Sequence, residues 1–136
     1  MRRLTPTHDP ARSPRGVRRA AALLLCAALV PAWAAAGPSW VVAGGDPQRG
    51  ARLIQSFGCA ACHTVPGIDH ARGNVGPALA RIGDRTYIAG MLHNTPPNLV
   101  RWIRAPQSVV PGNAMPDMGI TEAQARDIAA YLYTLH

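Results

Sequence analysis

Two cysteines and a histidine stand close together in the middle of the chain, as Cys59-Ala60-Ala61-Cys62-His63. Two thiols separated by two residues can form thioether bonds with the two vinyl groups on one edge of a porphyrin, which makes C-x-x-C-H the attachment motif of a covalent haem. The histidine that directly follows the second thiol is then placed to bind the iron. The motif therefore predicts one haem c per chain, attached through Cys59 and Cys62, with His63 as an axial ligand of the iron.

Two other uses of a C-x-x-C pair fit the rest of the chain less well. A thioredoxin-like dithiol needs a preceding strand and a β-α-β unit around it. No run of alternating apolar and polar residues indicates such a strand. A zinc site needs further ligands, but the third cysteine is Cys26, near the N-terminus, and the histidines are scattered. We therefore favour haem attachment.

A second axial ligand has to come from elsewhere in the chain. Met115 lies in the segment Pro111-Gly112-Asn113-Ala114-Met115-Pro116, in which two prolines restrict the backbone. A stiff loop can hold a thioether on iron with little ordering cost, and a methionine opposite a histidine raises the reduction potential relative to two imidazoles. We expect Met115 to be this ligand. The other candidates are Met118, which ranks next, His93, which would give bis-histidine ligation, and Met91, His70 and His136.

The first 36 residues differ in composition from the rest. They hold six of the fourteen arginines, an unbroken apolar run Ala20–Val30, and Ala34 and Ala36 at an A-x-A spacing. This order predicts a secretory signal peptide over residues 1–36, with an uncleaved N-terminal anchor as the alternative. Residues 37–136 then form the working domain, which we expect in the periplasm, with the leader as its only link to a membrane. The formal charge falls from +7 for the whole chain to +2 for this domain, which argues against nucleic-acid binding.

The domain is predicted to be all-α, with three to five helices wrapped around the haem. Capping and helix-breaking residues place helices from Pro47 to Gly58, from Asp84 to Ala89, from Pro96 to the residue before Pro106, and from Thr121 to Leu135, with a long loop over Thr64–Gly83. Asp117, Glu122 and Asp127 are expected to be surface charges. Nothing in the chain resembles a catalytic triad, paired catalytic carboxylates or a phosphate-binding loop.

From Gly45 to Leu135 the sequence resembles the class I cytochromes c, and from Tyr87 onward it is similar to bacterial cytochrome c domains associated with haem–copper oxidases. The resemblance implies the cytochrome c fold. It also implies that Gly50 and Ile54 pack against the last helix at Tyr131, where a glycine lets two helices approach closely.

Several further roles are implied by the resemblance alone. The carbonyl of Pro77, in Gly76-Pro77, would accept the proton of the His63 imidazole. Trp102 would lie near the methionine sulfur, and Asn113 would contact a haem propionate. The family often places an arginine near the propionates, and Arg85 is a better candidate here than Arg81.

The resemblance implies an electron carrier of a respiratory chain rather than an enzyme, with a single haem and His/Met ligation. Its partners would be redox proteins, a terminal oxidase or an upstream reductase or dehydrogenase. One alternative is a haem c subunit of a periplasmic dehydrogenase or oxidase complex, and an alternative of another class is a haem sensor or peroxidase with an open coordination site. The chain has no lysine, so we expect docking to be more apolar and less sensitive to salt than docking through a ring of lysines.

Overall fold

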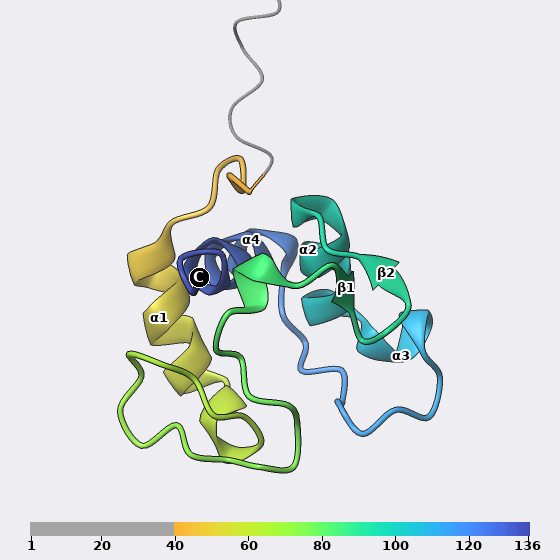
Figure 1. Cartoon of the computed structure of the whole chain (residues 1–136), viewed down its shortest axis with the longest axis horizontal. Coiled ribbons are helices and arrows are strands. Elements are labelled where there is room, and N and C mark those ends of the chain that lie inside the picture. Colours follow the sequence, from red (N-terminus) through yellow and green to blue (C-terminus); the bar gives the residue numbers. More distant parts are fainter. Residues whose placement is uncertain (1–39) are drawn as a thin grey trace, which may run out of the picture. The chain divides into compact units, whose positions relative to one another are not determined.

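A computed structural model describes residues 40–136, the part of the chain that holds the C-x-x-C-H motif (Figure 1). The predicted leader lies outside the described residues. Within residues 40–136 the α-helices are α1 (Pro47–Ser56), α2 (Pro96–Arg104), α3 (Pro106–Val109) and α4 (Glu122–Leu132). Two 3₁₀ turns, η2 (Cys59–Ala61) and η3 (Ile82–Asp84), and a hairpin of strands β1 (Tyr87–Ile88) and β2 (Leu92–His93) complete this part of the chain. None of the helices in it is both long and apolar enough to cross a membrane.

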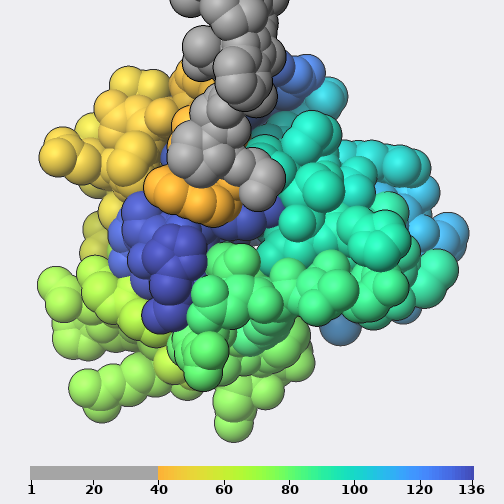
Figure 2. Space-filling model, turned by 45° about the horizontal axis from the view of Figure 1, so that its top comes forward, coloured from red at the N-terminus to blue at the C-terminus, as the bar shows by residue number. Residues whose placement is uncertain are grey.

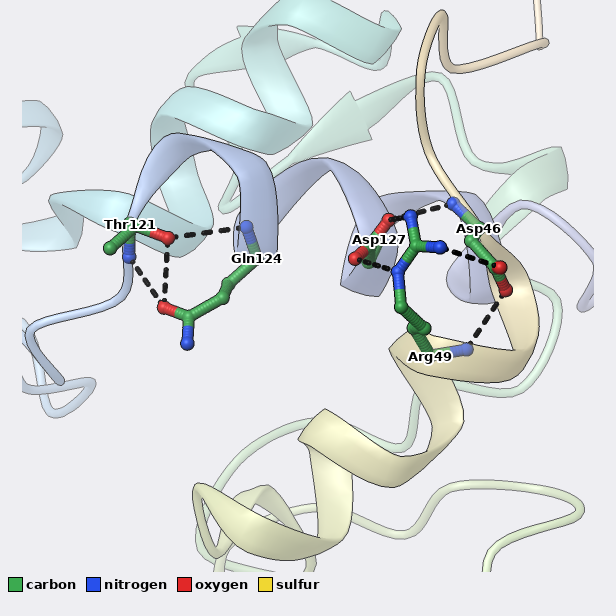
Figure 3. A network of polar contacts seen from close by, with 5 residues as sticks. All are labelled: Asp46, Arg49, Thr121, Gln124 and Asp127. Atoms are coloured by element: carbon green, nitrogen blue, oxygen red, sulfur yellow. Dashed lines mark hydrogen bonds and ion pairs between the residues drawn. The ribbon is translucent and has the colours of Figure 1, made fainter.

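The ends of α1 and the start of α4 are where the capping residues predicted them. The carboxylate of Asp46 accepts the backbone N–H of Arg49 at 2.9 Å, and a proline follows as the first helical residue. Gly58 ends the turn after α1 with φ of +68°, a conformation that suits glycine. At α4, Thr121 and Gln124 form the predicted capping box, each accepting the backbone N–H of the other (Figure 3).

The predicted helix from Asp84 to Ala89 is wrong. Asp84 ends the turn η3, and the chain then forms the antiparallel pair β1–β2, with Ile88 opposite Leu92. Ala89 and Gly90 both have positive φ, +51° and +70°, and the Met91 N–H donates to the Ile88 carbonyl at 3.0 Å. Two consecutive residues of positive φ closed by this hydrogen bond form the hairpin turn of type I′. Gly90 therefore belongs to a turn and does not end a helix. The two strands that it joins are each two residues long, too short to show alternating apolar and polar residues.

Helices α1 and α4 pack against each other at Gly50 (Figure 1). A Cβ atom on Gly50 would lie 2.0 Å from the carbonyl oxygen of Asp127 and 3.0 Å from the Cβ of Tyr131. Only a residue without a side chain allows this approach of two helix backbones. The predicted pairing of Gly50 with the last helix is therefore confirmed, and Ile54, one turn later, is 1% exposed in the core.

Asp127 is not the surface charge that the sequence suggested, because it is only 6% exposed. Its carboxylate accepts two hydrogen bonds from the Arg49 guanidinium, at 2.8 and 2.9 Å, and one from the backbone N–H of Asp46 at 2.7 Å (Figure 3). The hydrogen bond from Arg49 lowers the pKa of Asp127 below its usual value of 3.8. The carboxylate thus joins the start of α1 to the middle of α4, while Glu122 and Asp117 are exposed as predicted.

Another part of the core lies between α2 and α4, and the buried residues Val65, Ile68 and Ala71 of the long loop belong to the same cluster. Leu99 and Ile103 of α2 and Ile128 and Leu132 of α4 are all at most 4% exposed. Residues 40–44 lie against the C-terminal end of α4 (Figure 2), where the rings of Trp40 and His136 meet edge to face at 6.1 Å. In the view of Figure 1, the long loop after η2 and the loop between α3 and α4 both extend to the lower side of the helices. These two loops carry the predicted ligands.

Candidate haem-binding site

The two thiols lie on one tight turn at the end of α1. After Gly58 reverses the chain, the Cys62 and His63 N–H groups both donate to the Cys59 carbonyl, at 3.2 and 2.9 Å. Both cysteines are partly buried, and no disulfide joins them. The turn therefore presents two free thiols and, directly after them, the imidazole.

The environment of Cys59 differs from that of a reactive redox thiol. Burial raises the pKa of the Cys59 thiol above its usual value of 9.0. Dithiol oxidoreductases and other reactive cysteines depend on a lowered pKa, which provides the thiolate at neutral pH. This finding agrees with the choice of haem attachment over a thioredoxin-like function. Within residues 40–136 no group of three or more His, Cys, Asp or Glu side chains could hold a metal ion, as the zinc alternative would require.

The His63 ring is oriented by the loop that follows it. Its Nδ1 lies 2.7 Å from the carbonyl oxygen of Pro77, which is the contact that the resemblance implied. A carbonyl can only accept, so Nδ1 carries the proton and donates it. In the neutral ring this contact selects the tautomer whose other nitrogen, Nε2, is free to bind a metal.

Gly76 contacts the same ring from the side, a role that its position before Pro77 did not by itself predict. A Cβ atom on Gly76 would lie 2.3 Å from Cε1, 2.7 Å from Nδ1 and 2.9 Å from Nε2 of His63. The Gly76 N–H donates to the Cys62 carbonyl at 2.8 Å, so the glycine backbone is tied to the motif itself. The glycine that precedes Pro77 was the only sequence signal for this contact.

Met115 is partly buried in the loop between α3 and α4. Its backbone N–H donates to the Asn113 side-chain oxygen at 2.8 Å. The Asn113 Nδ2 group donates to the carbonyls of Pro106, at 3.1 Å, and Val110, at 2.6 Å. Both donors of this amide are thus used on backbone carbonyls, one of α3 and one of the loop. The Asn113 side chain is thus held by backbone groups of the protein, and its implied contact with a propionate stays a prediction.

The other predicted residues lie in different surroundings. Arg85 donates to the carbonyls of Ala78 and Ala80, next to Pro77, whereas Arg81 pairs with Asp84 at 3.0 Å. Trp102, on α2, is partly buried and packs against the core. The described hydrogen bonds link His63 to Pro77 and Gly76 to Cys62 around one predicted ligand, and Asn113 to Met115 around the other. None of them joins these two groups of residues.

The alternative ligands are mostly exposed. Met91 is 66% exposed and Met118 is 38% exposed. His93 is exposed on β2 and its ring lies 4.8 Å from that of Tyr87. His70 and His136 are exposed as well. Among the candidates for the second ligand, Met115 alone is partly buried. A groove lined by residues of α2, α3 and α4, among them Arg101, Ser108 and Glu122, contains none of the predicted haem residues.

Comparison with known proteins identifies the family. The sequence model of the family Cytochrome c matches residues 47–136. The chain is 40% identical over 91 residues to cytochrome c oxidase subunit 2 of Alkalihalophilus pseudofirmus, which covers 65% of this chain and 25% of that protein. It is 35% identical over 105 residues to cytochrome c2 of Rhodopila globiformis, covering 67% of this chain and 94% of that protein. It is also 31% identical over 114 residues to the cytochrome c-type cyt cy of Rhodobacter capsulatus, covering 77% of this chain and 56% of that protein.

The all-α fold and the C-x-x-C-H turn define a small haem protein, and the chain belongs to the cytochrome c family. It is similar to class I cytochromes c, including those associated with oxidases, and its cofactor is covalently bound haem c. The chain spans about a quarter of the oxidase subunits that it matches. The residues present fit this cofactor. Two free thiols stand beside an imidazole whose Nδ1 is hydrogen-bonded to Pro77, and a residue larger than Gly76 would collide with that imidazole ring. Electron transfer is the function that this family membership supports.

Proposed function

We propose that this chain is a mono-haem electron carrier whose haem is attached through Cys59 and Cys62, with His63 and Met115 as the axial ligands. The observation that carries this proposal is the 2.7 Å contact between His63 Nδ1 and the Pro77 carbonyl, directly after two partly buried thiols. When bound, the haem supplies a one-electron Fe(II)/Fe(III) couple. The role of the chain is to keep both ligands in place, so that the coordination is the same in both oxidation states.

The residues around each ligand support that role. Gly76 and Pro77 fix the plane and the tautomer of the His63 ring. Asn113 fixes the peptide of Met115 from within its own loop. Trp102 and Arg85 complete the proposed haem surroundings, Trp102 beside the core and Arg85 directly after η3, where it donates to carbonyls of the loop that contains Pro77. Closed coordination of this kind favours electron transfer over the binding of oxygen or peroxide.

We propose further that the protein is exported to the periplasm and passes electrons to a terminal oxidase of a respiratory chain. The order of basic, apolar and small residues over positions 1–36 supports export. Two relatives are named cytochrome c oxidase subunit 2, which supports an oxidase as the partner. Oxygen uptake by oxidase-containing membranes, with the purified reduced protein as the only electron donor, tests this assignment. Failure to stimulate oxygen uptake would refute it.

A second candidate is a haem c subunit that stays within a dehydrogenase or oxidase complex. The match to the oxidase relative favours this second candidate, because it covers only 25% of that relative and the matching part therefore belongs to a larger chain. The mass and N-terminus of the mature protein, determined from soluble and membrane fractions, separate the two candidates. A carrier is expected in the soluble fraction without residues 1–36, whereas a subunit is expected to remain with the membrane or to co-purify with its complex.

The ligand assignment is tested with Met115→Ala and, as a matched control, Met118→Ala. The unmodified ferric protein should show the long-wavelength charge-transfer band of a thioether–iron bond, and the ferrous protein should not bind CO. Met115→Ala should lose the band and bind CO, while Met118→Ala should behave as the unmodified protein does. Loss of the band only in Met118→Ala would assign the ligand to Met118. CO binding by the unmodified protein would instead favour the open-site sensor or peroxidase.

A further inference from the structure

Gln107 lies on the four-residue helix α3. The sequence pattern predicts no helix there, because Pro106 marks the end of the preceding helix. Proline is equally suited to the first position of a new helix, and here Pro106 is fully buried in that position. The buried proline anchors α3 against the domain. Gln107 follows immediately, partly buried, and points its amide into the loop that carries Met115.

The Gln107 amide makes three hydrogen bonds to the backbone of this loop. Its Nε2 donates to the Met115 carbonyl at 2.7 Å and to the Asn113 carbonyl at 2.9 Å. Its Oε1 accepts the Gly112 N–H at 3.0 Å. Its backbone N–H also reaches the Asp117 carboxylate at 3.4 Å. The Gln107 side chain therefore uses both of its N–H donors and its oxygen acceptor. Its partners are Gly112 and Asn113, which precede Met115, and Met115 itself.

The peptide groups on both sides of the Met115 Cα are held in this way. The N–H is held by Asn113 and the carbonyl by Gln107, at 2.8 and 2.7 Å. The Asn113 backbone is in turn fixed at its carbonyl by Gln107 and at its N–H by Val110, at 3.2 Å. With both neighbouring peptides fixed, the Cα–Cβ direction of Met115 is set by two amides that belong to α3 and to the loop.

We propose that Gln107 is a positioning residue for the Met115 ligand, which it holds by anchoring the Met115 and Asn113 carbonyls to α3. This inference rests on the proposed His63/Met115 ligation. A thioether is a weak neutral ligand, so its occupancy of the iron depends on the loop being ordered before the bond forms. The two donors of the Gln107 amide provide that order at the Asn113 and Met115 carbonyls, in a loop whose prolines at 111 and 116 have no N–H to donate.

The test compares Gln107→Glu with Gln55→Glu in the haem-loaded protein at neutral pH. Gln107→Glu keeps the length and the acceptor but loses both donors, and it places a carboxylate against two carbonyl oxygens. Gln55 is exposed on α1, so its substitution makes the same change of charge away from the loop. Gln107→Ala is a third variant, which removes the amide without adding a charge. The measurements are the thioether–iron band and the affinity of the ferric protein for imidazole, which competes with the methionine.

Gln107→Glu and Gln107→Ala are expected to bind imidazole roughly tenfold more tightly, the size expected when one or two ordinary hydrogen bonds are lost. Gln55→Glu should bind imidazole as the unmodified protein does. Unchanged affinity and an unchanged band in both Gln107 variants would overturn the inference, even if their melting temperatures fell, because a purely structural role would lower stability alone. The companion variant Met115→Ala separates the two failures. If it keeps the band, the ligand assignment itself is wrong, and if it loses the band while the Gln107 variants do not change, only the role of Gln107 is refuted.

Discussion

Substituting Gly76 by alanine is the sharpest test of how the His63 ring is held. The added Cβ would lie 2.3 Å from Cε1 of the ring, whereas two carbon atoms in contact prefer about 3.5–4.0 Å. Either the ring or the backbone of residue 76 has to move by more than ~1 Å. The backbone is held by its hydrogen bond to the Cys62 carbonyl at 2.8 Å, and the ring by the Pro77 carbonyl at 2.7 Å. A movement of ~1 Å exceeds the range of an effective hydrogen bond, so one of the two is lost.

The size of the effect follows from these contacts. Overpacking costs about 1–3 kcal/mol. A lost hydrogen bond adds about 1 kcal/mol. We therefore expect Gly76→Ala to lower the free energy of unfolding by about 2–4 kcal/mol, which corresponds to a fall of roughly 10–30 °C in the melting temperature of a domain of this size. If the Pro77 contact is the one that breaks, the imidazole becomes a weaker electron donor to iron and the reduction potential rises.

Thermal unfolding and a spectroscopic redox titration of the haem-loaded protein measure both effects. Gly90→Ala is the matched control, because a Cβ there meets nothing within 4 Å and the cost is only that of a positive φ, about 1 kcal/mol. Pro77→Ala is a second control, since it keeps the backbone carbonyl and should leave the potential nearly unchanged. If Gly76→Ala melted and titrated as Gly90→Ala does, the argument that Gly76 crowds and orients the ring would be refuted.

Three further predictions concern packing, charge and docking. Gly50→Ala should lower the free energy of unfolding by at least ~2 kcal/mol in urea denaturation, although alanine favours helices, because its Cβ would lie 2.0 Å from a backbone oxygen of α4. Since the pKa of Asp127 is lowered in the folded state, its contribution to stability is complete above its usual value of 3.8 and is lost as the pH falls below it. Melting temperatures from pH 5 down to pH 2 should show this loss. The Asp127→Asn variant should be less stable at pH 5, and its melting temperature should change less with pH over that range. Oxygen uptake with this protein as the electron donor should depend only weakly on salt concentration, as a domain of charge +2 without lysine predicts; a steep fall with salt would contradict this prediction.

Much of the local structure could be predicted from the sequence because it depends on residues a few positions apart. Asp46 with its following proline, and Thr121 with Gln124, defined helix starts that the structure contains. The prediction failed between Asp84 and Gly90, where the same residue types serve a turn between two strands of two residues each. It also failed at Pro106, which both ends one helix and begins the next. In each case a glycine or proline has two local uses, and the packing of the surrounding segments decides between them.

The sequence by itself determined the chemistry, because the thiols and the imidazole of C-x-x-C-H are joined by short covalent spacing that folding cannot change. It also determined the need for a small residue at position 50, through the resemblance to a known family. Only the tertiary structure decided that Gly76 crowds the His63 ring, that Asp127 is buried against Arg49, and that Gln107 holds the Met115 loop. These contacts join segments of the chain whose spacing follows no helix or strand period. Burial and hydrogen-bond partners between such segments depend on how the whole domain packs, which no local pattern of residues specifies.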